Sequence, residues 1–224
     1  MDVLRKFLPP NYEKLVGLDI NESMVNHASK QYSDERTSFV VQDIADVLQS
    51  SLRQSFDHAF SIYALNWVKD QKAAFRNIYD MLTEGGDLLA IFLSSGSCFE
   101  AYRSLKQINK WSSIMGDVEQ YIPPLQDSKD PNKEVKKILE TVGFKNIHLE
   151  HAPKKFAFKN IEDLKKSLKA VCPFVIPMDR SEDFQEDYLQ VLRDLGYLRK
   201  ASHPPDEEGH LLGLKTVTVY ATKI

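Results

Sequence analysis

Residues 14–24 read KLVGLDINESM, and this stretch decides the fold of the chain. A short run of aliphatic residues in this stretch leads to an acid, Asp19. This is the pattern of a buried parallel strand. The carboxyl ends of parallel strands form the rim at which α/β domains bind ligands. An acid there can accept hydrogen bonds from both hydroxyls of a ribose, so we expect an adenosine-containing ligand. The alternative is that Asp19 only caps a helix beginning near Glu22.

A second strand with the same ending follows after one helix. Apolar residues recur at helical spacing over residues 22–32, and TSFVVQDI at 37–44 reads as a strand that finishes on Asp43. A βαβ unit of this kind brings both carboxylates to one edge of the sheet. Asp43 could accept a hydrogen bond from an adenine amino group while Ile44 covers the ring. The alternative is that Asp43 opens a helix over residues 45–52.

A third and a fourth strand continue the pattern. SFDHAFSIYALNWV at 55–68 reads as a strand with its exit, which places Tyr63 and Trp67 at the carboxyl end where substrates bind. A helix over 71–82 leads to the strand GGDLLAIFLSS at 85–95. Its nearly continuous apolar run predicts a strand covered on both faces.

The second half predicts helices and a late strand pair. An amphipathic helix at 134–144, with Gly143 at its end, precedes a strand at 146–158, and the alternating strand LKTVTVYATK at 214–223 can pair with it antiparallel. The polar stretch RKASHPPDEEGH at 199–210 predicts a loop. The fold class is therefore α/β: a Rossmann-like, doubly wound sheet, mainly parallel, with an antiparallel C-terminal strand pair.

We expect one domain with a single core over residues 1–224. In this domain residues 1–95 form the cofactor-binding part, and residues 96–135 and 159–210 form helical insertions around a substrate pocket. Trp111 lies at helical spacing in the first insertion. Its side chain could either contact the substrate or lie in the apolar core.

Composition excludes several function classes. The net charge is −3, so no basic field indicates a nucleic acid or an anionic membrane as partner. No apolar run approaches the length that spans a bilayer. The only cysteines are Cys98 and Cys172, which favours a reducing, cytoplasmic location. Of the histidines only His148 and His151 are closely spaced, along a predicted edge strand, so we expect no metal site.

The start of the chain is unusual for such a fold. Residues 2–8 show a helical pattern that Pro9 and Pro10 end, and no strand with a glycine-rich turn precedes it. The usual first strand is thus lacking, which would leave two neighbouring strand edges unpaired. We expect from this a fragment or alternative product of a longer enzyme that binds its cofactor poorly.

Several segments resemble one enzyme family in the right order. They are LVGLDINESMVNHA, the long segment from SFDHAF to LLAIFL, KWSSIMGDVEQYIPPLQDSKDP, and the region around AVCPF. Together they resemble the class I S-adenosylmethionine-dependent methyltransferases of the type 11 group, and within it the juvenile hormone acid O-methyltransferases of arthropods. The resemblance covers essentially the whole chain.

The resemblance implies roles for individual residues. Asp19 would bind the ribose of S-adenosylmethionine, and the other implied cofactor contacts are Ile20, Met24, Asp43, Ile44, Ser61 and Ile62. The implied walls of a substrate pocket are Tyr63, Trp67, Trp111 and Tyr121. The family often has His where this chain has Asn66, so the role of that position stays open.

The implied reaction is transfer of a methyl group to the carboxylate of a small lipophilic acid of the farnesoic acid or juvenile hormone acid type. Such a carboxylate is ionised near neutral pH and needs no general base, so we assign no catalytic residue. One alternative is a dehydrogenase that uses Tyr102 and Lys106, a Tyr-x-x-x-Lys pair. The other alternative is a truncated protein with the same methyltransferase-like fold that binds a ligand without catalysing a reaction.

Overall fold

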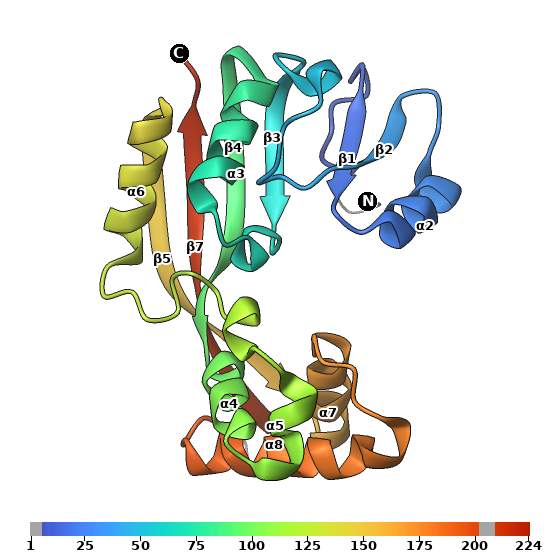
Figure 1. Cartoon of the computed structure of the whole chain (residues 1–224). Coiled ribbons are helices and arrows are strands. Elements are labelled where there is room, and N and C mark those ends of the chain that lie inside the picture. Colours follow the sequence, from blue (N-terminus) through green and yellow to red (C-terminus); the bar gives the residue numbers. More distant parts are fainter. Residues whose placement is uncertain (1–5, 202–208) are drawn as a thin grey trace.

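The computed structural model describes residues 6–201 and 209–224, and at residues 199–201 and 209–211 it describes the backbone alone. An α/β part carries the sheets, and a smaller helical part lies beyond the ends of the long strands (Figure 1). Buried apolar side chains form two clusters. One surrounds Phe75, Leu88 and Phe92 on the sheet, and the other surrounds Tyr102 and Tyr188 among the helices. The prediction of a single core is therefore wrong, because the helical part buries its own apolar faces.

The N-terminal βαβ unit confirms the first prediction. Strands β1 (Leu15–Asp19) and β2 (Thr37–Val41) pair in parallel, with helix α2 (Glu22–Tyr32) between them. Strand β2 ends three residues earlier than expected, since residues 42–46 form a turn. The helix expected as an alternative over 45–52 is absent, and only the short 3₁₀ helix η1 (Ser50–Leu52) forms there.

The larger sheet has the strand order β3-β4-β7-β5. Strands β3 (Phe56–Ile62) and β4 (Leu82–Gly96) are parallel, whereas β7 (Gly209–Thr222) runs antiparallel to β4 and to β5 (Lys145–Phe158). The expected antiparallel C-terminal pair is confirmed. Part of the predicted 199–210 loop is instead the short strand β6 (Arg199–Ala201), which pairs with the start of β7, while residues 202–208 lie outside the described residues.

The sheet is divided between β1 and β3. In the described part of the chain β1 pairs with β2 alone and β3 pairs with β4 alone, so one edge of each strand carries no ladder hydrogen bonds (Figure 1). The expected unpaired edges are thus present. Consequently the two halves of the sheet rim are connected by the chain after β2 and by contacts from helix α3 (Gln71–Met81).

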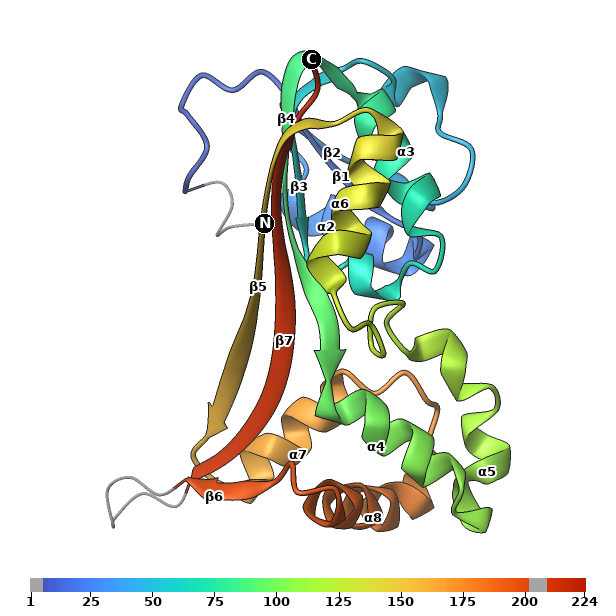
Figure 2. The ribbon, with the colours of Figure 1, turned by 90° about the vertical axis from the view of Figure 1, so that its left-hand side faces the viewer.

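Helices cover only one face of the larger sheet among the described residues. Helices α3 and α6 (Pro131–Val142) lie on the same side of β4 and β7 (Figure 2). Along β4, Leu88 and Phe92 are buried under them, while Leu89 points to the opposite face and is exposed. The prediction that this strand is covered on both faces is therefore wrong, because on the second face Leu89 is exposed and Ile91 and Leu93 are only half-buried.

The helical part consists of four α-helices and two 3₁₀ turns. They are α4 (Ser97–Lys106), α5 (Asn109–Met115), η3 (Val118–Tyr121), α7 (Ile161–Ala170), η4 (Met178–Arg180) and α8 (Ser181–Asp194). In the first of the expected helical insertions, residues 107–108 separate α4 from α5. No helix of the described residues is long and apolar enough to span a bilayer. Of the helix expected at 2–8, residues 6–8 form a turn and the rest lies outside the described residues.

Candidate active site

The end of β1 presents a carboxylate with free hydrogen-bonding capacity. Asn21, and not Asp19, is the N-cap of α2, since its side-chain oxygen accepts a hydrogen bond from the Met24 backbone N–H at 3.2 Å. The Asp19 Oδ1 atom accepts the Asn21 N–H at 2.8 Å, and no described side chain pairs with the carboxylate. The capping alternative is therefore wrong, and Asp19 is exposed at the rim.

Two large apolar side chains beside Asp19 lie in solvent. Ile20, directly after the strand, is 65% exposed, and Met24, in the first turn of α2, is 55% exposed. Exposed apolar side chains next to an uncompensated carboxylate are informative, because burial of such groups is normally favourable. The arrangement fits a ligand that is apolar on one part and carries hydroxyl donors on another, as an adenosine does.

The end of β2 brings Asp43 close to Asp19. The Gln42 N–H donates to the Asp19 carbonyl oxygen at 3.0 Å, so Asp43 follows immediately beyond the last rung between the two strands. The Asp43 Oδ1 atom accepts the Ala45 N–H at 2.8 Å. From α3 the Asn77 amide donates to the Ile44 carbonyl at 2.8 Å and holds this turn in place. The sequence did not single out Asn77.

The exit of β3 forms the other side of the rim. Ser61 is half-buried and Ile62 is exposed at the end of the strand. Tyr63 follows with a φ angle of 54°, which is rare for a bulky side chain and marks a constrained turn. Trp67 is the last residue of the short helix η2 (Leu65–Trp67) and is 42% exposed. Strain combined with exposed aromatic rings is typical of a binding site.

The side chain of Asn66 holds this exit loop in place through hydrogen bonds. It is only 2% exposed. Its side-chain oxygen accepts a hydrogen bond from the Trp67 indole N–H at 2.9 Å, and its amide nitrogen donates to the Tyr63 carbonyl at 3.2 Å. The role that the sequence left open is thus a positioning one, since Asn66 connects the two exposed aromatic residues of the rim.

A series of ring contacts leads from the rim into the helical part. Trp67 meets Phe99 edge-on with ring centroids 6.1 Å apart, and Phe99 meets Tyr102 at 6.2 Å. Phe174 then contacts both Tyr102, at 5.1 Å, and Tyr121, at 5.2 Å. The structure therefore connects Trp67 and Tyr121, two of the predicted substrate contacts, through a continuous aromatic wall.

Trp111 lies elsewhere. Its ring is fully buried within the helical part, 5.1 Å from the Phe184 centroid, and its indole N–H donates to Asp187 Oδ2 at 2.6 Å. The Arg180 guanidinium stacks over the same ring at 4.6 Å. The structure does not bring Trp111 to the rim with Tyr63, and its present contacts are those of a core residue.

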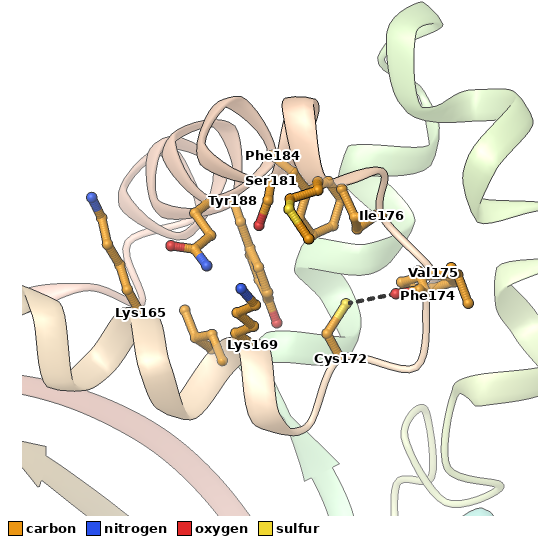
Figure 3. A pocket seen from close by; sticks show the side chains of 12 residues that line it. Lys165, Lys169, Cys172, Phe174, Val175, Ile176, Ser181, Phe184 and Tyr188 are labelled. Carbon is orange, nitrogen blue, oxygen red and sulfur yellow. Dashed lines mark hydrogen bonds between the residues drawn. The ribbon is translucent and has the colours of Figure 1, made fainter.

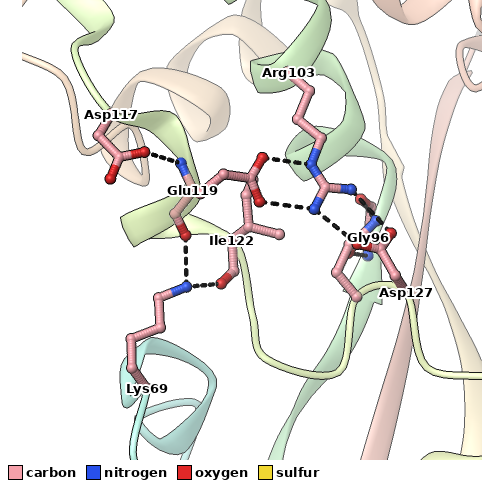
Figure 4. A network of polar contacts seen from close by, with 8 residues as sticks. Lys69, Gly96, Arg103, Asp117, Glu119, Ile122 and Asp127 are labelled. Atoms are coloured by element: carbon pink, nitrogen blue, oxygen red, sulfur yellow. Dashed lines mark hydrogen bonds and ion pairs between the residues drawn. The ribbon is translucent and has the colours of Figure 1, made fainter.

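A network of hydrogen bonds and ion pairs connects the loop that carries Trp67 to the helical part (Figure 4). The Lys69 ammonium, two residues beyond Trp67, donates to the carbonyl oxygens of Glu119, at 2.6 Å, and of Ile122. Desolvation by burial lowers the pKa of Lys69. The network continues from Glu119 to Arg103, so the loop that carries Trp67 is tied to the segment that carries Tyr121.

Arg103 holds two carboxylates at once. It makes paired hydrogen bonds of 2.8–2.9 Å to Glu119 and to Asp127. The hydrogen bonds from Arg103 lower the pKa of Glu119 and the pKa of Asp127. Arg103, Glu119 and Asp127 therefore keep their charges at neutral pH.

The dehydrogenase alternative finds no support in the geometry. Tyr102 is buried in the helical cluster, and desolvation raises the pKa of its hydroxyl. The Lys106 ammonium donates to the Ser112 carbonyl at 2.6 Å. This pair is therefore packed inside the helical part and does not face the rim. Among the described residues no group of three His, Cys, Asp or Glu side chains could hold a metal ion.

Comparison with known proteins identifies the family. A family model described as a methyltransferase domain matches residues 3–90. The juvenile hormone acid O-methyltransferase of Bombyx mori is 43% identical over 224 residues, which is all of this chain and 81% of that protein. The chain belongs to the juvenile hormone acid O-methyltransferase family. The enzyme of the same name from Drosophila melanogaster is 39% identical over 228 residues, covering all of this chain and 76% of that protein.

Solved structures agree on the fold of this family member. A methyltransferase structure from Bacillus halodurans superposes with a TM-score of 0.56 at 15% identity, covering 94% of this chain and 83% of that one. Phosphoethanolamine N-methyltransferase 2 of Haemonchus contortus gives a TM-score of 0.53 at 17% identity, covering 94% of this chain and 43% of that one. The Rossmann-like α/β fold expected from the sequence is confirmed, and the chain is a methyltransferase of the S-adenosylmethionine-dependent class.

Proposed function

We propose that this methyltransferase transfers a methyl group from S-adenosylmethionine to the carboxylate of a small lipophilic acid, of the farnesoic acid or juvenile hormone acid type. Family membership supports the reaction type. The observation that supports the assignment of the site is the exposed Asp19 carboxylate at the end of β1, with the exposed side chains of Ile20 and Met24 in the segment that follows it. The two free cysteines favour the cytoplasm as the compartment in which it works.

In this proposal the residues of the first two strand ends hold the methyl donor. The unpaired oxygen of Asp19 accepts hydrogen bonds from the ribose hydroxyls. Ile20, Met24 and Ile44 cover the adenine faces, and Asp43 accepts a hydrogen bond from the adenine amino group. Ser61 and Ile62 lie beside the methionine portion. S-adenosylmethionine supplies the methyl group from a positively charged sulfonium, which is a good leaving group.

The rest of the rim positions the acid. A carboxylate with a pKa of roughly 4 is already ionised at neutral pH, so no side chain has to remove a proton. A bond forms between a carboxylate oxygen and the methyl carbon while the sulfur–carbon bond breaks, and the products are a neutral ester and a thioether. Catalysis is then mainly alignment and exclusion of water, which we assign to Tyr63 and Trp67. The apolar body of the acid lies against the two accessible ends of the aromatic wall, Trp67 and Tyr121, since Phe99 and Tyr102 between them are buried.

Mass spectrometry of the reaction products tests this function. The chain is incubated with farnesoic acid and a high concentration of S-adenosylmethionine, because the unpaired edges of β1 and β3 predict weak binding of the methyl donor, and we expect the methyl ester to form. Farnesol serves as the matched control substrate, because its hydroxyl would need a base that the rim lacks. Methylation of farnesol at a comparable rate would contradict the base-free assignment. Acid binding by the folded chain without any ester would contradict the proposal and identify the non-catalytic alternative.

A further inference from the structure

The rim loop, residues 63–70 after β3, is bonded to the helical part through one side chain. Among the described residues, Lys69 makes the only hydrogen bonds between this loop and residues 97–130. Its ammonium donates to the carbonyl oxygen of Glu119 at 2.6 Å and to the carbonyl oxygen of Ile122 (Figure 4). Lys69 is therefore a tether between the rim loop and the helical part.

The two accepting carbonyls flank Tyr121. They belong to η3 and to its C-cap, and a positive charge is favourable at the C-terminal end of a helical turn. Lys69 also lies only two residues after Trp67, which keeps their Cα atoms within about 7 Å of each other. The tether thus connects the backbone next to Trp67 with the backbone next to Tyr121, and these are the two accessible ends of the aromatic wall.

The segment that receives the tether is itself fixed to α4. The Glu119 carboxylate pairs with the Arg103 guanidinium through two hydrogen bonds of 2.8 and 2.9 Å. Arg103 also pairs with Asp127, which follows η3 in the chain. Because these bonds hold η3 against α4, the Lys69 tether positions the rim loop relative to the helical part as a whole.

The aromatic wall continues into the helical part beyond Tyr121. The ring centroids of Tyr121 and Phe174 are 5.2 Å apart. Phe174 also lines an apolar cavity of about 360 Å³ between helices α7 and α8 (Figure 3). At the other end of the wall, Trp67 is exposed at the rim. The apolar surface for a long hydrocarbon chain is therefore divided between the two sides of the tether, whereas a short chain meets the rim side alone.

We propose that Lys69 is a positioning residue that sets the preference of this methyltransferase for long acids over short ones. The inference rests on the proposed methyl transfer to a lipophilic acid. By holding Trp67 and Tyr121 at a fixed separation, Lys69 allows one hydrocarbon chain to pack against both rings. Each CH₂ group that leaves water at the second ring favours the longer acid. A short acid depends on Trp67 alone, which Asn66 holds in place without the tether.

Ester formation from farnesoic acid and from the six-carbon hex-2-enoic acid tests the inference. Lys69→Met keeps an unbranched side chain and removes its donors. It should lower kcat/KM for farnesoic acid about ten-fold, mainly through KM, and kcat/KM for hex-2-enoic acid by less than about two-fold. Lys69→Arg can still donate to both carbonyls and should restore the preference in part. Lys72→Met, at an exposed position on α3, is the matched control and should behave as the unchanged chain does.

Tryptophan fluorescence gives a second measurement that does not need turnover. The chain has two tryptophans, and Trp111 is fully buried, so acrylamide quenches mainly Trp67. Farnesoic acid should protect Trp67 from acrylamide at a concentration about ten-fold higher in Lys69→Met than in Lys72→Met.

Two results would overturn the inference. The first is a loss of kcat/KM in folded Lys69→Met that is equal for the long and the short acid, or no loss for either. The second is equal protection of Trp67 in Lys69→Met and Lys72→Met. If no variant forms an ester, the proposed function fails, and the protection of Trp67 alone decides the role of Lys69.

Discussion

Replacing Asn66 by Ala tests whether the rim loop is held as the structure shows. The substitution removes the acceptor for the Trp67 indole N–H and the donor to the Tyr63 carbonyl, both at a position that is almost fully buried. Each such hydrogen bond contributes about 0.5–1.5 kcal/mol, so we expect the free energy of unfolding to fall by about 1–3 kcal/mol. For a chain of this size a loss of about 2 kcal/mol lowers Tm by about 4–8 °C.

The same change should also act on the substrate. With Trp67 free to rotate, KM for the acid should rise and kcat should fall, each several-fold, because Trp67 both binds the acid and aligns it for methyl transfer. Urea unfolding followed by tryptophan fluorescence measures the stability, and ester formation measures the kinetics. Asn66→His should restore both in part, since imidazole can accept and donate. Asn26→Ala, an exposed position on α2, is the control. An Asn66→Ala variant with unchanged stability and KM would refute the reasoning.

Three further predictions concern other parts of the molecule. Asp19→Asn should weaken binding of S-adenosylhomocysteine about ten-fold or more in isothermal titration, because an ionised acceptor is lost. Arg103→Met should lower the free energy of unfolding by about 1 kcal/mol at pH 7. Because the folded-state pKa values of Glu119 and Asp127 are lowered, this difference is present above about pH 4 and should shrink as the pH falls further, which urea titrations at several pH values check. Thr216→Val should raise the free energy of unfolding by about 1 kcal/mol in chemical denaturation, because it removes a buried hydroxyl without a partner among the described residues.

Local patterns predicted most of the strands and helices. The run that ends at Asp19, the helix over 71–82 and the alternating C-terminal strand all form where periodicity places them. The C-cap of α6 at Gly143, with a φ angle of 125°, also follows from sequence. These features are local or depend on one buried face, so a single sequence is enough to find them.

The errors have a different physical origin. Burial on the second face of β4 depends on which elements pack against that face. The apolar sequence DLLAIFL of β4 carries no information about those elements. The division of the buried residues into two clusters likewise depends on contacts between α4 and α8, far apart in the chain.

Of the candidate site, the strand-end acids could be predicted because strand ends meet at one rim. The supporting residues could not be predicted in the same way. Asn66 and Asn77 act through side-chain bonds to backbone carbonyls on other loops. Trp111 was expected at the substrate, but its partner Asp187 lies 76 positions away and holds it in the helical core. Pairings of this kind appear only in three dimensions.

A crystal structure of the chain with S-adenosylhomocysteine tests the central claim most directly. We predict that both ribose hydroxyls lie within hydrogen-bonding distance of the Asp19 carboxylate, with the adenine between Met24 and Ile44. A nucleoside bound at another part of the sheet, or an Asp19 side chain turned away from the ribose, would contradict the account.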